Sequence, residues 1–200
     1  MFNFFRTSRQ RGDAAWFCAG PASSYPDIQP MDPDAVVVEV ISTPRPRACG
    51  TPSSLPVAGC KIFHVSEDAE TGGVTASEVR VQDVAQVEGI DALKDQVLVF
   101  QYKGQFHAVD HKCPHMSYPL SNATPFDIED FGIVLSAGLT CPKHGWSFDM
   151  FTGMGDRGNY RLQIWEVELR DVAGNVTKAT EKEVDLSDKD VWVRRKQRIG

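Results

Sequence analysis

Two short motifs, each pairing a cysteine with a histidine, constrain this chain more than any other feature of its sequence. The first is Cys113-Pro114-His115. The second is Cys141-Pro142-Lys143-His144, and 25 residues lie between the two motifs. Thiolates and neutral imidazoles are ligands for both zinc and iron, and four of them complete one coordination set. The sequence therefore predicts a metal centre whose ligands come from two loops.

The resemblance to known proteins extends beyond the four ligands. CPHMSYPLS and CPKHGWSFD resemble the two halves of the fingerprint of Rieske [2Fe–2S] proteins, and the resemblance covers about residues 57–180. It implies that Cys113 and Cys141 bind one iron of a [2Fe–2S] cluster and that His115 and His144 bind the other, which raises the reduction potential. One alternative is a Cys₂His₂ zinc site, although the single residue between Cys113 and His115 is a tight spacing for zinc. Another is a Rieske fold that keeps its shape without a cluster.

Three positions indicate a branch within that family. Respiratory Rieske proteins have a disulfide between their cluster loops, at positions occupied here by Tyr118 and Lys143, and usually a serine at the position of Trp146. These departures point to the ferredoxin or oxygenase-like branch, with a lower potential because fewer hydrogen bonds reach the cluster. The long segment between the motifs, which includes DIEDFG, resembles the small soluble Rieske ferredoxin-like proteins of animals.

Other residues near the motifs are expected to support the ligands. Trp146 and Phe148 should pack under the second loop and keep water from the cluster. Backbone N–H groups of residues 115–118 and 143–146 are candidates to donate hydrogen bonds to sulfur. The segment GMGDRGNYR, which begins at Gly153, corresponds to a shielding loop of relatives but lacks their proline, so the sequence leaves the shielding open.

Alternation of apolar and polar residues predicts an all-β fold. Half-buried strands are expected in four segments: GCKIFHV, VRVQDVAQV, VLVFQYKGQFHAVD and LQIWEVELRDVAGNVTKAT. Hairpin turns are expected at Lys103-Gly104 and at residues 173–175. No long amphipathic helix is evident. We therefore expect the Rieske fold, an antiparallel β-sandwich or barrel, with a small cluster-binding lobe at about residues 107–150.

Composition divides the chain into three parts. Eight of the twelve prolines fall between Pro21 and Pro56, so residues 1–56 are predicted to form a Pro-rich, partly disordered N-terminal extension, with one possible strand at residues 36–41. Residues 57–183 are predicted to form the Rieske domain, and residues 184–200 a basic C-terminal strand or tail. That basic end is either a solvated strand or a docking strip for an acidic redox partner.

Charge, hydropathy and cysteine content argue against a nucleic-acid-binding, membrane-spanning or disulfide-rich protein. A net charge of −6 gives no reason to expect nucleic acid as a partner, and no apolar run approaches the ~20 residues of a membrane helix. We therefore expect a soluble protein. Cys18, Cys49 and Cys60 show no disulfide framework, and Cys60 is predicted to be a small buried apolar residue. The expected compartment is the cytoplasm, with the mitochondrial matrix as an alternative because the N-terminal FNFFRTSRQR is basic.

The rest of the sequence indicates that the protein transfers electrons and does not itself catalyse an oxygenation or a hydride transfer. No histidine follows His144, so a second, mononuclear iron site is not expected, and neither a flavin nor a nicotinamide fingerprint is found. We therefore expect a Rieske-type ferredoxin and not an enzyme: a one-electron carrier from a flavin reductase to an oxygenase or other acceptor. One alternative is the small Rieske subunit of a multi-component reductase, similar to that of nitrite reductase. Another is a redox- or pH-responsive regulator.

His111 is a candidate to lie at the cluster's edge and influence docking, although most such histidines belong to the core or surface.

Overall fold

The computed structural model describes residues 15–29, 59–67, 73–79, 93–181 and 184–196, and these residues form strands and two short 3₁₀ helices. The strands are β1 (Phe17–Pro21), β2 (Asp27–Ile28), β3 (Cys60–Glu67), β4 (Val74–Val79), β5 (Gln96–Tyr102), β6 (Gln105–Asp110), β7 (Thr124–Asp130), β8 (Ile133–Cys141), β9 (Trp146–Asp149), β10 (Trp165–Asp171), β11 (Val176–Lys178) and β12 (Lys189–Arg195). The 3₁₀ helices are η1 (Ala22–Ser24) and η2 (Leu120–Asn122). The all-β prediction is confirmed. Within these ranges, no helix has the length and apolar character that crossing a membrane requires.

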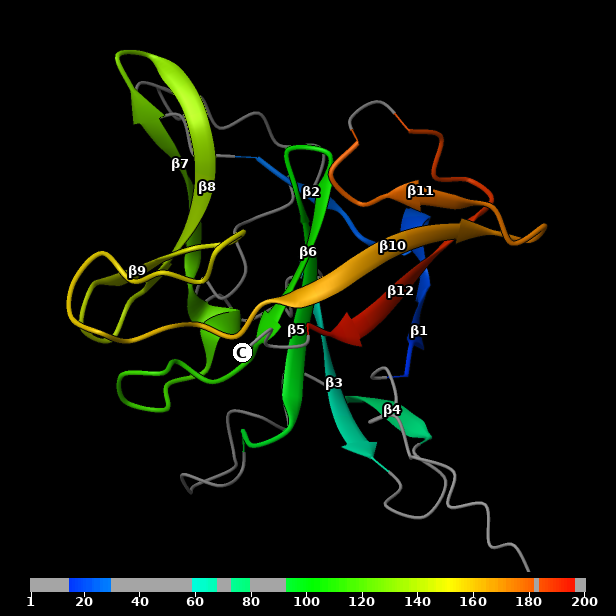
Figure 1. The fold of residues 1–200 in the computed structure, drawn as a ribbon, viewed down its shortest axis with the longest axis horizontal. Helices are drawn as coiled ribbons and strands as arrows, with labels where there is room; N and C mark the ends of the chain where they lie inside the picture. The colour runs from blue at the N-terminus through cyan, green and yellow to red at the C-terminus, as the bar shows by residue number, and fades with distance from the viewer. Residues whose placement is uncertain (1–14, 30–58, 68–72, 80–92, 182–183, 197–200) are drawn as a thin grey trace, which may run out of the picture.

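The strands form three sheets, which Figure 1 shows around a central pair, β5 and β6. The first sheet has the order β1-β12-β10-β11, the second has the order β2-β5-β3-β4 with β6 also paired to β5, and the third has the order β7-β8-β9. Neighbouring strands are antiparallel, except for the parallel pair β2 and β5. This arrangement agrees with the expected stack of antiparallel sheets.

Strand β5 lies at the centre because its sequence is apolar on both faces. All seven of its residues are buried. Val97 and Val99 join the core formed with β1, β10 and β12, whereas Leu98 and Phe100 join the core that reaches the third sheet. A continuous apolar run is what a strand covered on both faces requires. The cluster lobe therefore packs directly on the same strand as the first sheet.

Both predicted hairpin turns are confirmed, and one predicted strand lies mostly outside the described residues. Lys103 and Gly104 join β5 to β6 with φ values of 50° and 76°, the left-handed backbone of a tight two-residue turn. Gly174, with a φ of 84°, lies in the turn between β10 and β11. Of the segment VRVQDVAQV only Val79 is described, and residues 36–41 lie outside the described ranges.

Part of the predicted N-terminal extension belongs to the folded body. Phe17 of β1 lies opposite Val193 of β12, and β2 pairs with the end of β5. The Phe17 side chain is 5% exposed, and its ring lies 5.7 Å from that of Phe63 and 6.3 Å from that of Trp165. Proline-rich composition concealed these strands because both are short and lie at sheet edges, where proline is tolerated. Strands β1 and β2, from the segment predicted to be an extension, therefore contribute to two of the sheets.

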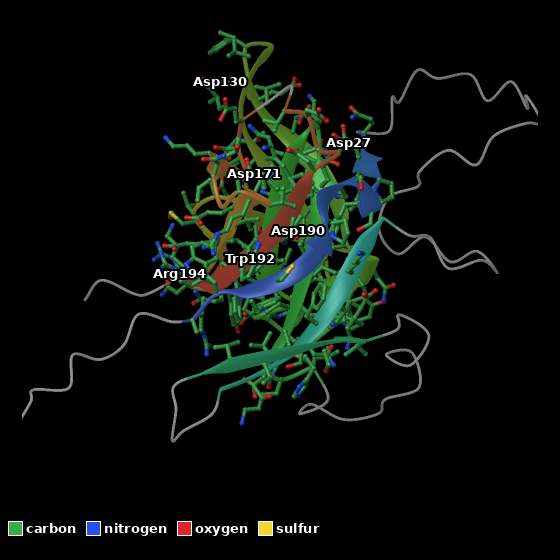
Figure 2. The ribbon with its side chains drawn as sticks, turned by 90° about the vertical axis from the view of Figure 1, so that its right-hand side faces the viewer. Asp27, Asp130, Asp171, Asp190, Trp192 and Arg194 are labelled. Carbon is green, nitrogen blue, oxygen red and sulfur yellow. The ribbon has the colours of Figure 1, made fainter. Side chains whose placement is uncertain are left out.

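Within the basic C-terminal segment, residues 189–195 form β12, which is an inner strand. β12 lies between β1 and β10, and Figure 2 shows Trp192 and Arg194 along it. Arg194 Nε donates to Glu166 Oε2 at 2.8 Å, and its guanidinium lies 4.5 Å from the centroid of the Trp16 ring. Arg195 lies 5.8 Å from the centroid of the Trp165 ring. These arginines are thus engaged within the fold.

Cysteine chemistry in the body differs from the prediction at one position. Cys60 is 7% exposed, as expected, but it is disulfide-bonded. Spacing alone does not reveal which cysteines pair, so the sequence could not predict this bond. Cys18, Cys113 and Cys141 are free thiols.

The long segment between the motifs forms the β7–β8 hairpin, which stands away from the rest of the molecule in Figure 1. Its turn contains Phe131 and Gly132, with φ values of 48° and 78°. Near its base, Asp127 accepts hydrogen bonds from Lys103 Nζ at 2.6 Å and from the Tyr102 hydroxyl at 3.1 Å. The hairpin is therefore fixed to the β5–β6 turn, and β8 leads from it directly into the second ligand motif.

Candidate metal centre

The two motifs lie on two loops that have the same local geometry. The first loop follows β6 and contains Cys113, and the second joins β8 to β9 and begins at Cys141. The N–H of Ser117 donates to the carbonyl oxygen of Cys113 at 2.8 Å, and the N–H of Gly145 donates to that of Cys141 at 3.0 Å. Ser117 and Gly145 both have left-handed backbones, with φ values of 53° and 65°. Each cysteine therefore begins a tight turn that carries its histidine.

The two cysteines are brought together in the core. Cys113 and Cys141 are each 1% exposed and belong to the core that contains Leu98 and Phe100 of β5. Their side chains lie within hydrogen-bonding reach of each other, as expected for two ligands of one iron.

Backbone N–H groups also reach one of these sulfurs. Burial raises the pKa of the Cys141 thiol and the neighbouring Cys113 adds to the rise, whereas the N–H groups of Lys143 and His144 lower that pKa by donating to the sulfur. This is the tuning expected for residues 143–146. For the first loop, donation to sulfur stays a prediction.

The two histidines form a second pair. The ring centroids of His115 and His144 are 5.0 Å apart, with their planes at 82°. His115 Nδ1 is buried and has no hydrogen-bond partner among the described residues. A buried polar atom without a partner is costly, and an imidazole nitrogen in that state is suited to bind a metal. The observation fits His115 as an iron ligand through Nδ1.

The proposed ligands form a thiol pair and an imidazole pair. Among the described residues, no group of three or more His, Cys, Asp or Glu side chains surrounds a single metal position. A tetrahedral zinc site needs four ligands around one ion, whereas a Rieske cluster needs one pair for each iron. The thiol pair and the imidazole pair correspond to the two pairs of ligands that such a cluster needs.

Aromatic rings cover one imidazole and leave the other in solvent. The ring of His115 lies 4.8 Å from that of Trp146 and 5.3 Å from that of Tyr160, whereas His144 is exposed. Phe148 is 1% exposed and stacks on Trp146 at 6.5 Å. The predicted packing of Trp146 and Phe148 under the second loop is thus confirmed.

The loop whose shielding role the sequence left open does take part in the site. Tyr160 comes from this loop, residues 153–161. Arg157 of the same loop lies 5.1 Å from the Trp146 ring centroid and donates to the carbonyl oxygen of Gly145. Sequence reasoning missed Arg157 and Tyr160. The only available signal was a cation and an aromatic residue in an otherwise glycine-rich loop.

A non-covalent contact joins the two ligand loops. Lys143 Nζ lies 5.7 Å from the centroid of the Tyr118 ring. At the positions where respiratory relatives have a disulfide, this chain therefore has a cation–π contact, which typically contributes about 0.5–1 kcal/mol at an exposed site.

The remaining histidines are not part of the centre. His111 is fully buried, with ring nitrogens 2.8 Å from Gln96 Oε1 and 3.0 Å from Ser121 Oγ. The expectation that it influences docking at the cluster's edge is therefore wrong, and it is a core histidine. His107 is also buried, between the rings of Phe100 and Phe151.

Comparisons with known proteins agree with this geometry. Residues 74–163 match the model of the Rieske [2Fe-2S] domain family. Apoptosis-inducing factor 3 of Homo sapiens is 30% identical over 115 residues, which are 58% of this chain but only 14% of that protein. The methanesulfonate monooxygenase ferredoxin subunit of Methylosulfonomonas methylovora is 27% identical over 50% of this chain and 80% of its own length. The ferredoxin component of the alkene monooxygenase system of Xanthobacter autotrophicus is 29% identical over 48% of this chain and 71% of its own length.

The matched region contains both motifs, the whole third sheet and strands β4, β5 and β6 of the second sheet, but no strand of the first sheet. The matching part is only a small fraction of apoptosis-inducing factor 3, but it is most of the length of the two ferredoxin relatives. The likeness therefore lies in the domain that carries the two pairs of ligands. Residues 74–163 of this chain therefore match the Rieske [2Fe-2S] domain family, and that domain indicates a Rieske-type [2Fe–2S] cluster as the cofactor.

Proposed function

We propose that this chain is a one-electron carrier, a Rieske-type ferredoxin, with Cys113, His115, Cys141 and His144 as the ligands of its cluster. The observation that carries the proposal is the arrangement of a buried thiol pair beside an imidazole pair with an unpartnered Nδ1. When bound, a [2Fe–2S] cluster with this mixed ligand set takes up and releases one electron at a higher potential than an all-cysteine cluster.

The surrounding residues bury one side of the site and leave the other side accessible to a partner. Cys113 and Cys141 are anchored in the core that includes β5, which keeps water from the sulfur side. His115 lies under Trp146 and Tyr160, whereas His144 is exposed. Electrons therefore enter and leave most directly along the His144 imidazole, where a partner can approach closely.

The two ferredoxin relatives support a place for this carrier between a reductase and an oxygenase. We place a flavin reductase on the donor side because the sequence contains no nucleotide fingerprint with which to accept hydride itself. On the acceptor side we place an oxygenase, or another enzyme that consumes single electrons.

The proposal is tested by visible absorption and low-temperature EPR spectra of the aerobically purified protein, before and after reduction with dithionite. We expect a red-brown protein with two irons and two sulfides per chain, whose reduced form gives the low average g value of a mixed Cys/His cluster. A colourless protein with stoichiometric zinc and no EPR signal would overturn the proposal.

A further inference from the structure

The surface around the exposed imidazole has a charge opposite to that of the whole chain. We define the tip surface as the side chains of residues 112–118, 142–146 and 153–161 that are exposed or half-buried; these three segments surround the proposed ligands. These segments contain four cations and one carboxylate, so their net charge is +3, whereas the whole chain has a net charge of −6. The cations are Lys112, Lys143, Arg157 and Arg161, and the carboxylate is Asp156. The rest of the molecule therefore carries −9.

Two of these cations are held in place beside the ligands. Lys143 lies over the Tyr118 ring, and Arg157 lies over the Trp146 ring while donating to the carbonyl oxygen of Gly145. The Arg157 side chain remains 53% exposed. Cations fixed in this way act on a partner without first losing the conformational freedom of long side chains. Their charge is therefore concentrated around His144.

The same three segments also carry exposed apolar side chains. Met116, Met154 and Tyr160 are 54%, 57% and 43% exposed. Methionine, tyrosine and arginine are enriched in protein–protein interfaces, and a cluster of exposed apolar side chains with a polar rim marks an interaction site. Tyr160 also contacts the ring of His115. The patch therefore adjoins the ligands and is not a separate surface.

We infer that the tip surface docks a redox protein that has acidic side chains around an apolar centre. This inference rests on the proposed function and names the charge of the partner. At an ionic strength of about 0.1 M, charges act over roughly 10 Å, so an approaching protein meets the local +3 more strongly than the −9 spread over the rest of the molecule. The basic C-terminal strand is the weaker candidate for such docking, because β12 belongs to the first sheet and packs in the core that contains no proposed ligand.

The sign of the local charge can be measured without knowing the partner. The reduced protein, freed of dithionite, is oxidised in a stopped-flow instrument by the hexacyanoferrate(III) trianion or by the tris(phenanthroline)cobalt(III) trication, each of which accepts one electron. We expect the rate with the anion to fall on the order of tenfold as ionic strength rises, and the rate with the cation to rise. Acidic flavodoxin and basic cytochrome c, used as protein probes, should repeat the two signs.

Arg161→Glu tests the assignment to this surface, and Lys178→Glu is its control. Both residues are exposed and both substitutions change the charge by the same amount, but Lys178 lies on β11, on the opposite side of the molecule from β9 in Figure 1. Arg161→Glu should weaken the salt dependence with the anion, whereas Lys178→Glu should leave it nearly unchanged. Equal effects of the two substitutions, or salt dependences with the signs expected from a net charge of −6, would overturn the inference.

A second measurement separates this inference from the proposed function. Hexacyanochromate(III) is a paramagnetic anion that exchanges no electron here, so its broadening of amide NMR signals locates positive surface whether or not the cluster is redox-active. We expect selective broadening of residues 157–161, reduced in Arg161→Glu. Absence of that broadening overturns the inference alone, whereas absence of a reducible cluster overturns the proposed function alone.

Discussion

At the scale of single residues, Cys141 combines burial with contacts that suit an iron ligand. It lies in the core with Cys113, and the backbone N–H groups of Lys143 and His144 lower the pKa of its thiol. Cys141→Ser should therefore lose most of the iron, because a hydroxyl is a poor substitute for a thiolate at this soft metal site. Iron content and visible absorption measure the loss. Cys18→Ser is the matched control, because Cys18 is an exposed free thiol, and a full unchanged spectrum in Cys141→Ser would refute the ligand assignment.

His107 makes stability depend on pH. Burial lowers its pKa from 6.5 to about 4, and its Nε2 has no partner among the described residues. Between those pH values the unfolded chain binds more protons than the folded protein, so the free energy of unfolding falls as pH is lowered from 6.5 towards 4. At 1.36 kcal/mol per pH unit, the contribution of this one residue is ~3 kcal/mol.

His107→Phe should reduce that loss of stability, because a phenyl ring keeps the contacts with Phe100 and Phe151 and has no proton to bind. Denaturant unfolding at pH 7 and at pH 4.5 measures the difference. His64→Gln is the control, since His64 is exposed on β3. A pH dependence that is as steep in His107→Phe as in the unaltered protein would show that His107 is not its source.

At the scale of elements, the N-terminal strands contribute to the body. Deleting residues 1–28 removes β1 and β2, which leaves an edge of β12 unpaired and exposes the core around Phe63 and Trp165. We expect a large loss of thermal stability. Phe17→Ala alone should cost roughly 3–5 kcal/mol.

Thermal unfolding followed by circular dichroism checks this expectation. Deletion of residues 1–14 is the control, because it removes no described element. If the two deletions unfolded at the same temperature, β1 would not contribute to stability.

The outer part of the β7–β8 hairpin should be dispensable for cluster binding. Ile128 and Ser136 lie directly opposite each other, so an Asn-Gly turn can replace residues 129–135. Asp127, which fixes the hairpin to Lys103, is retained. The shortened protein should keep its iron content and EPR spectrum. Loss of the cluster would instead mean that the tip of the hairpin helps to position Cys141.

At the scale of the whole molecule, the two cores should respond differently to removal of the cluster. One core contains both ligand cysteines, whereas the other lies between the first two sheets and contains no proposed ligand. Metal sites and folding are coupled where the ligands belong to the packed structure. After chelation of iron, amides of β8 and β9 should lose protection from hydrogen exchange, and those of β10 and β12 should keep it. Hydrogen exchange with mass spectrometry tests this, and uniform loss of protection would contradict it.

The sequence by itself determined the features that depend on residue type and short spacing. The four proposed ligands, the apolar run of β5 and the two hairpin turns are of this kind, because ligand chemistry, strand periodicity and left-handed turn backbones act over a few residues. Contacts between distant segments were decided only by the tertiary structure. Examples are Tyr160 over His115, Lys143 over Tyr118, and β1 beside β12. Which imidazole is covered and where cations gather depend on how loops far apart in sequence pack together, and no local pattern encodes that packing.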